Sequence, residues 1–234
     1  MKTCLVGCGG IAAVHGSVLT SGIDTEFVAA ADIKPEKAQS YAENFHTKPY
    51  PSLESMLEAE KPDVLHICTP HYLHVPMAIY SPERNINVFM EKPPAISFDQ
   101  LEELKKAAAK SEAQLGFCYQ NRYNASIRAA KDLIDSGKAG KVLGARAFVT
   151  WCRGAAYYTE SGWRGSLKTE GGGVLINQSV HTQDLLCFLL GDPTTVDATM
   201  TNHHLKNVIE VEDTLEAYIL SLIHISEPTR HAQI

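Results

Sequence analysis

A glycine-rich turn near the amino terminus constrains the fold of this chain more than any other segment. The turn reads Gly7-Cys8-Gly9-Gly10-Ile11-Ala12. It follows an apolar run at residues 3–6 and precedes apolar residues at helical spacing over 11–20. In this G-x-G-x-x-A pattern the glycines permit a tight turn and a close approach of the backbone to a pyrophosphate. We expect Gly7, Gly9, Gly10, Ile11 and Ala12 to bind a dinucleotide at the amino end of a helix; the alternative is a purely structural turn.

The first half of the chain alternates strand-like and helix-like segments. Strands are expected at residues 3–6, 26–31, 64–68, 87–90 and 114–118, and helices at 11–20, 35–44, 53–59, from 73 onward, and at 98–110. Such alternation is typical of parallel βαβ units with right-handed crossovers. We therefore predict an α/β fold in which residues 1–120 form a Rossmann domain, a doubly wound parallel sheet that binds NAD(P).

The pattern changes after Gln120. A helix at 125–136, a long strand at 142–151, a polar and glycine-rich loop at 153–173, a helix at 180–190 and strands at 195–202 and 214–219 are expected. Long strands with few helices are typical of an antiparallel sheet. Residues 121–219 are therefore predicted to form part of an α+β domain for substrate binding and oligomerisation, with a mainly antiparallel sheet.

Residues 220–234 form a tail unlike the rest of the chain. The run from Leu220 to Arg230 resembles the translation of a transposon-type sequencing-library adapter, and such segments are excluded from fold reasoning. On this interpretation the natural protein continues past Ile219, and the second domain is incomplete here. The alternative is a genuine edge strand that ends at Pro228.

Composition excludes several classes of protein. The formal net charge is −6 at pH 7 and basic residues are scattered, which argues against a nucleic-acid partner. No apolar run is long enough to span a bilayer, and the first residues lead directly into a strand without room for a signal peptide. The six cysteines form no C-x-x-C pair, and no ligand set has zinc spacing. We therefore expect a cytoplasmic protein with reduced cysteines, no metal and no membrane partner.

Asp32 closes the second expected strand, about twenty residues after the glycine turn. A carboxylate there can accept hydrogen bonds from ribose hydroxyls and would repel a 2′-phosphate, which favours NAD over NADP. Lys34 could offset that charge, so NADP is not excluded. The alternative for Asp32 is a helix-capping carboxylate ahead of Pro35.

Two later segments follow strands that should end at the same edge of the sheet as the turn. Thr69, Pro70 and His71 follow the strand at 64–68, and His74 lies just beyond; we expect these residues near the nicotinamide-side ribose, with surface histidines as the alternative. Glu91 and Lys92 follow the strand at 87–90, so Lys92 places a cation where ligands bind in parallel sheets. Glu91 could position neighbouring groups or lie on the surface.

Taken together, the motifs resemble one family. The glycine turn, Cys68-Thr69-Pro70-His71, Glu91-Lys92-Pro93 and Gly171-Gly172-Gly173 followed by Asn177-x-x-x-His181-x-x-Asp184 are similar to the Gfo/Idh/MocA oxidoreductases, from Lys2 to about Ile219. The resemblance implies hydride transfer between a nicotinamide cofactor and a sugar, polyol or related hydroxy or keto compound. It also implies a homo-oligomer, and catalytic residues Lys92 and His181 beside the cofactor.

The residue types suit that chemistry. His181 can take a proton near neutral pH, and Lys92 can stabilise negative charge on a substrate oxygen. Asn177 would share a face with His181 if both lay on one helical turn, but many family members carry Asp there, and Asn cannot relay a proton. Asp184 could orient His181 or bind substrate. The alternative for His181 is a core histidine.

Other polar and aromatic residues are candidates for substrate binding. The resemblance places Arg122 and Tyr123 beside cofactor and substrate, and Trp163 and Arg164 lie in the polar loop. Either arginine could bind a carboxylate or phosphate, although Arg122 could instead tie the domains together.

A rival interpretation is a non-catalytic dinucleotide-binding regulator or scaffold. The presence of Lys92 and His181 argues against this rival, whereas Asn177 and Ser179, which stands where the family often has Gly, keep it open.

Overall fold

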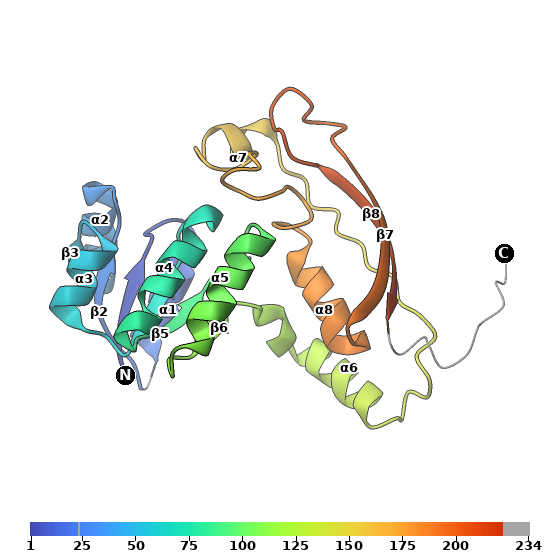
Figure 1. Ribbon diagram of the computed structural model, residues 1–234, viewed down its shortest axis with the longest axis horizontal. Helices are drawn as coiled ribbons and strands as arrows, with labels where there is room; N and C mark the ends of the chain where they lie inside the picture. Colours follow the sequence, from blue (N-terminus) through green and yellow to red (C-terminus); the bar gives the residue numbers. More distant parts are fainter. Residues whose placement is uncertain (23, 222–234) are drawn as a thin grey trace. The chain divides into compact units, whose positions relative to one another are not determined.

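The computed structural model describes residues 1–22 and 24–221 (Figure 1). The chain divides into two compact units. The first unit contains Met1–Cys118 and Lys168–Gly171, and the second contains Tyr119–Leu167 and the described residues from Gly172 onward. Of the expected adapter-derived tail at residues 220–234, Leu220 and Ser221 belong to a strand that ends at Ser221, and residues 222–234 lie outside the described residues.

The first unit is built on a parallel sheet with strand order β3-β2-β1-β4-β5-β6. The strands are β1 (Lys2–Val6), β2 (Glu26–Ala31), β3 (Lys48–Tyr50), β4 (Val64–Ile67), β5 (Asn87–Met90) and β6 (Leu115–Phe117). β1 pairs with both β2 and β4. Strands β2 and β3 therefore extend the sheet on one side of β1, and strands β4 to β6 extend it on the other side, so the order of strand addition reverses beside β1. Ligands bind at such a switch point, outside the carboxyl ends of the strands. The predicted doubly wound fold is confirmed.

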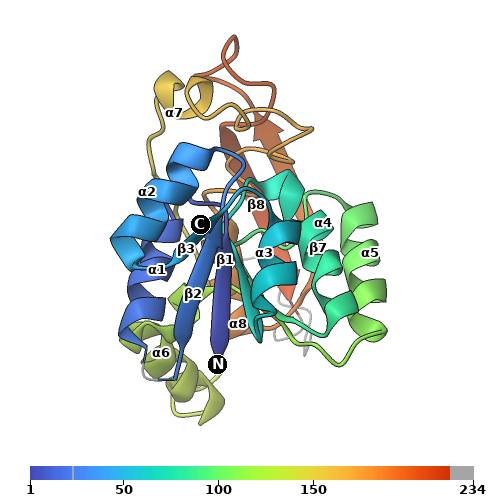
Figure 2. The same cartoon turned by 90° about the vertical axis from the view of Figure 1, so that its left-hand side faces the viewer.

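Helices cover both faces of this sheet (Figure 2). They are α1 (Ala12–Ser21), α2 (Pro35–Phe45), α3 (Leu53–Glu60), α4 (His74–Tyr80) and α5 (Phe98–Ala109), with short 3₁₀ turns at His71–Leu73 and Pro82–Arg84. Successive residues of β1 point to opposite faces, so Cys4 and Val6 pack with α3, α4 and α5, whereas Leu5 packs with α1 and α2.

Local sequence signals fix the helix boundaries. The side chains of Ser52 and Ser97 accept hydrogen bonds from the N–H groups of Ser55 and Gln100, each at 3.2 Å. Both serines are helix caps of the usual residue type. The side-chain oxygen of Gln100 accepts the N–H of Ile96 and not that of Ser97, so the reciprocal bond of a capping box is not formed. The three-residue strand β3 was not expected.

The second unit contains 3₁₀ helix η3 (Gln120–Tyr123), α6 (Ala125–Asp135), α7 (Ala155–Thr159), α8 (Val180–Leu190), β7 (Pro193–Thr201) and β8 (Thr214–Ser221). β7 and β8 form an antiparallel pair, as expected. Within the loop expected at 153–173, α7 forms a short helix.

The expectation of a long strand at 142–151 is wrong. This segment has no regular secondary structure and is largely exposed. A strand is stable only when a neighbouring strand satisfies its N–H and C=O groups, and no described segment pairs with this one. Apolar alternation was therefore insufficient evidence for a strand.

No helix within the described ranges is both long and apolar enough to cross a membrane.

Candidate functional site

The glycine turn follows β1 directly and leads into α1. Gly7 adopts φ +92°, and a Cβ there would lie 2.7 Å from the carbonyl carbon of Cys68, so the position requires glycine. A Cβ at Gly9 or Gly10 would meet no protein atom within 4 Å. The backbone of the turn is thus open to a ligand, while buried Ala12 lets α1 pack closely on the sheet.

Asp32 fastens this turn to the end of β2. Its two carboxylate oxygens accept the N–H of Cys8 at 2.9 Å and the N–H of Lys34 at 2.8 Å. Each oxygen has a further lone pair that could accept a ribose hydroxyl. The first turn of α1 contains no acidic residue, so its positive end is available to a pyrophosphate. The residues present therefore fit a dinucleotide.

The two histidines after β4 are buried, so the surface alternative is wrong. Nδ1 of His71 lies 2.9 Å from the carbonyl oxygen of Glu170. Nδ1 of His74 lies 2.8 Å from the carbonyl oxygen of Pro93, and its Nε2 lies 2.9 Å from that of Thr69. Burial lowers the pKa of His74, against the opposing effect of these carbonyl contacts. His74 thus links the segments that follow β4 and β5.

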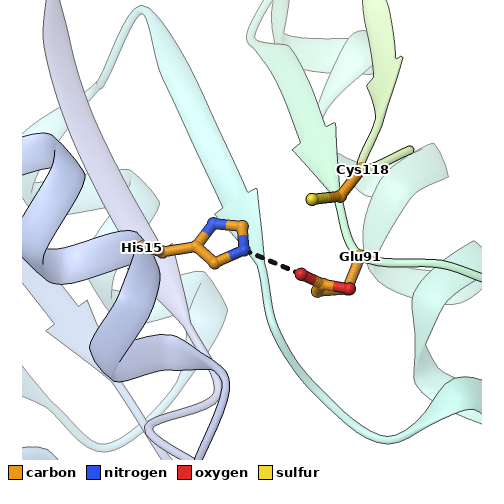
Figure 3. A group of neighbouring side chains, drawn as sticks. All are labelled: His15, Glu91 and Cys118. Atoms are coloured by element: carbon orange, nitrogen blue, oxygen red, sulfur yellow. Dashed lines mark hydrogen bonds and ion pairs between the residues drawn. The ribbon is translucent and has the colours of Figure 1, made fainter. Parts of the chain in front are cut away.

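Glu91 is also buried, with 7% of its surface exposed, so a surface role is wrong for it as well. One carboxylate oxygen, Oε1, lies 2.9 Å from Nε2 of His15 on α1 (Figure 3). The other, Oε2, accepts the backbone N–H of Lys92 at 3.3 Å. Burial alone would raise the pKa of Glu91, but hydrogen bonds from His15 and Cys118 and the charge of Lys92 hold it below its usual range.

Within the described ranges, His15, Glu91 and Cys118 form a group whose possible ligand atoms lie within 4.8 Å of one another. The sequence offered no signal for this cluster, because its members come from α1, the end of β5 and the end of β6. His15 and Glu91 satisfy each other through a direct hydrogen bond.

His181 lies in the first turn of α8, in the second unit, and is buried. Its ring meets that of Tyr119 edge-on, with centroids 6.1 Å apart. Asn177 is buried too, and its side-chain amide donates to the hydroxyl of Tyr157 at 3.3 Å. Asn177 precedes α8, and the N–H of Ser179 donates to the carbonyl of Val174 five residues back. The condition under which Asn177 and His181 would share a face, a single helical turn through both, is therefore not met.

A glutamate that sequence reasoning missed holds the glycine triplet. The carboxylate of Glu212 accepts the N–H of Gly173 at 3.0 Å and the N–H of Leu175 at 2.9 Å. A Cβ at Gly173 would overlap the carbonyl oxygen of Glu212, so this position has no room for a side chain. Glu212 thus fixes the loop that leads to Asn177.

Arg122 and Asp184 form an ion pair within the second unit. Nε of Arg122 donates to Oδ2 of Asp184 at 2.8 Å, and a second guanidinium nitrogen donates to Oδ1. The hydrogen bond to Asp184 raises the pKa of Arg122. Both oxygens of Asp184 thus contact Arg122, and the pair joins η3 to α8.

The remaining substrate candidates also lie in the second unit. The guanidinium of Arg164 stacks 4.2 Å from the ring centroid of Tyr157 and 4.6 Å from that of Trp163. Tyr123 is 78% exposed. Sequence reasoning missed Gln178, which is buried and whose side-chain oxygen and nitrogen have no hydrogen-bond partner among the described residues.

Two family models match successive segments of this chain. Residues 1–119 match the GFO_IDH_MocA model, described as an oxidoreductase family with an NAD-binding Rossmann fold. Residues 127–220 match the GFO/IDH/MocA C-terminal domain.

Two of the solved structures that are similar to most of the chain are WlbA dehydrogenases. The WlbA dehydrogenase from Chromobacterium violaceum, in complex with NADH and UDP-GlcNAcA, is 32% identical with a TM-score of 0.90, covering 96% of this chain and 64% of that one. The WlbA dehydrogenase from Bordetella pertussis, with the same ligands, is 32% identical with a TM-score of 0.89, covering 95% of this chain and 67% of that one.

Among curated proteins, D-glucoside 3-dehydrogenase from Escherichia coli (strain K12) is 28% identical, covering 82% of this chain and 55% of the relative. The 1,5-anhydro-D-fructose reductase from Ensifer adhaerens is 30% identical, covering 76% of this chain and 53% of the relative. The chain thus spans about half the length of these relatives. Since the two family models match successive segments that together span most of its length, the chain belongs to the Gfo/Idh/MocA family of oxidoreductases, with an NAD-binding Rossmann fold.

Proposed function

We propose that the protein transfers a hydride between a nicotinamide cofactor and the CH–OH or keto group of a carbohydrate-like compound. One observation carries the proposal: a single sheet holds an open glycine turn after β1 and Lys92 after β5. A dinucleotide site and a cation at the same edge of a parallel sheet support chemistry beside a bound nucleotide.

NAD is the proposed cofactor, because Asp32 would repel the 2′-phosphate of NADP. We assign the glycine turn and the amino end of α1 to the pyrophosphate, and Asp32 to the adenosine ribose. Thr69, Pro70 and His71 are assigned to the nicotinamide side. His74 and Glu91 support that side through the contacts described above. Bound NAD would supply the hydride acceptor.

Lys92 and His181 are the proposed catalytic residues. Lys92 would donate a hydrogen bond to the substrate oxygen and stabilise negative charge as it develops. His181 would accept the hydroxyl proton, since its ring can exchange a proton near neutral pH. Asn177, an amide, would hold substrate or His181 without relaying a proton.

The proposed substrate is a sugar or polyol, with a UDP-linked sugar acid as the first compound to test. The structures that are 32% identical contain UDP-GlcNAcA, which supports that choice. Arg164, stacked on Tyr157 and Trp163, offers a cation for an anionic group. Tyr123 and Trp163 offer aromatic surface against which substrate could pack. The Arg122–Asp184 ion pair is assigned a supporting contact with substrate.

We further propose a cytoplasmic homo-oligomer. Six free cysteines, of which Cys4 and Cys68 are buried, support a reducing compartment. The register of β7 and β8 places Val196, Met200 and Ile219 on one face, and all three are exposed. An exposed apolar face of this kind supports association with a second copy.

The test is a turnover assay on the purified protein. A panel of UDP-sugars, free sugars and polyols would be incubated with NAD or NADP, and absorbance at 340 nm followed. NAD-dependent turnover of a carbohydrate supports the proposal. Tight NADH binding, measured by calorimetry, without turnover on any panel member would favour the regulatory alternative.

A further inference from the structure

A series of hydrogen-bonded buried and half-buried polar groups in the first unit ends on the backbone of Lys92. Nδ1 of His66 lies 2.9 Å from Nδ1 of His15, and Nε2 of His15 lies 2.9 Å from Oε1 of Glu91 (Figure 3 draws the last contact). Oε2 of Glu91 accepts the N–H of Lys92 at 3.3 Å. His66 comes from β4, His15 from α1 and Glu91 from the end of β5.

The proton positions in this series of hydrogen bonds follow from the chemistry of its groups. Glu91 is ionised near neutral pH because its pKa lies below the usual range, so it can only accept, and Nε2 of His15 must donate. Burial lowers the pKa of His66 to about 4, so His66 is neutral. The hydrogen bond between the two Nδ1 atoms requires one of them to carry a proton and the other to accept it.

This series of hydrogen-bonded groups therefore connects the helix after the glycine turn with the backbone of Lys92. His15 lies one turn into the helix that follows the glycine turn, and the carboxylate that it holds binds the peptide N–H of Lys92. On the other side of Lys92, His74 contacts the carbonyl of Pro93 at 2.8 Å. The backbone around Lys92 is held from both flanks by histidines that lie on different helices.

We propose that His15 is a positioning residue for Lys92. Through Glu91 it fixes the peptide from which the Lys92 side chain departs, relative to the turn assigned to the cofactor. This proposal rests on the proposed function of Lys92. A small displacement of a catalytic group has a large effect on rate, because catalysis requires reacting groups to be aligned closely.

The first experiment compares His15→Ala with the conservative His15→Gln, whose amide can still donate to Glu91. His15→Ala is expected to lower kcat by about 10- to 100-fold, with the substrate KM and the NADH Kd changed less than about threefold. His15→Gln is expected to recover most of kcat. In a Lys92→Ala background, His15→Ala should cause no further loss of kcat, because His15 acts through the Lys92 side chain.

Glu60→Gln is the matched control. Glu60 is likewise a buried glutamate of the first unit, but it bonds to Lys2 and Lys48 at the starts of β1 and β3, at the opposite edge of the sheet. Its replacement should lower stability and leave kcat unchanged. An equal loss of kcat in Glu60→Gln and His15→Ala would show a general structural effect and overturn the positioning role.

A second readout does not depend on turnover. Hydrogen exchange at the Lys92 amide should speed up at least about tenfold in His15→Ala and in Glu91→Gln, and remain as in the wild type in Glu60→Gln. Unchanged exchange in His15→Ala overturns the inference even if the enzyme is active. Absence of turnover in the wild type, with exchange behaving as expected, contradicts the proposed function alone.

Discussion

At the scale of single residues, burial and hydrogen bonding separate groups that look equivalent in the sequence. His66, His71 and His74 each contact a backbone carbonyl or another histidine inside the first unit. Sequence spacing cannot show this, because the contacts join positions far apart in the chain. The glycine at position 7 is different, since the local turn demands it and the motif predicts it.

Gln178 provides a test of substrate contact that the sequence did not suggest. A buried amide without partners costs stability, so Gln178→Met should raise the free energy of unfolding by about 1 kcal/mol. If substrate satisfies this amide, the same change should raise KM by about tenfold. Stability would be measured by urea denaturation and KM by steady-state kinetics.

Gln183→Met is the matched control for Gln178, because its amide nitrogen donates to Leu175 at 2.8 Å and to Ser179 at 2.7 Å. This variant should lose stability. A Gln178→Met variant that also loses stability and keeps its KM would contradict the substrate role.

At the scale of elements, the sequence predicted those whose signals are local. The helices capped by Ser52 and Ser97 begin at the predicted residues 53 and 98, and the strand at Asn87–Met90 has the predicted bounds. Two segments whose structure depends on distant pairing partners were not predicted correctly. β3 is short and contains Pro49, yet it pairs with β2, whereas the apolar segment at 142–151 finds no described partner.

The same distinction applies to the site. The glycine turn and the position of Lys92 after β5 follow from local sequence and the rules for parallel sheets. Two other contacts depend on tertiary packing, so no spacing in the sequence predicts them: the hydrogen bond between His15 and Glu91, and the one from the N–H of Gly173 to Glu212.

Glu60 joins three elements of the first unit and should make the fold sensitive to acid. Hydrogen bonds from Lys48, Tyr50 and Lys2 lower its pKa to about 2 from the usual 4.5. Because the folded pKa is the lower one, the stabilisation is complete above pH 4.5 and is lost as the pH falls toward 2. After allowance for solvent screening, we expect a loss of about 1–2 kcal/mol.

The check is to measure the midpoint of thermal unfolding of the wild type and of Glu60→Gln between about pH 6 and about pH 2, the range in which carboxylates titrate. The variant should be less stable at neutral pH and show a shallower decline. Parallel pH curves for the two proteins would show that Glu60 contributes nothing to acid sensitivity.

At the scale of the whole molecule, the two units differ in how completely their apolar side chains are buried. The first unit has a closed core on both faces of its sheet and the proposed cofactor residues. The second has an exposed two-stranded sheet with one apolar face, where Val196 is 59% exposed and Met200 is 53% exposed. Such a face is typical of a surface covered by another chain.

We therefore expect self-association through the β7–β8 face. Met200→Lys should shift the protein toward the 25.6 kDa monomer in sedimentation experiments, because a buried unpaired charge is costly. Thr199→Lys, on the opposite face of β7, should leave the assembly intact. A monomeric wild type, or equal dissociation in both variants, would contradict this assignment.

The central claim is that Lys92 and His181 perform chemistry beside a bound nicotinamide. The most direct test measures kcat at 340 nm and the Kd for NADH in the wild type, Lys92→Ala and His181→Ala, with the best substrate from the panel. We predict that kcat falls by about 1,000-fold or more in each variant while the Kd changes less than about threefold. Full activity of both variants on that substrate would contradict the account.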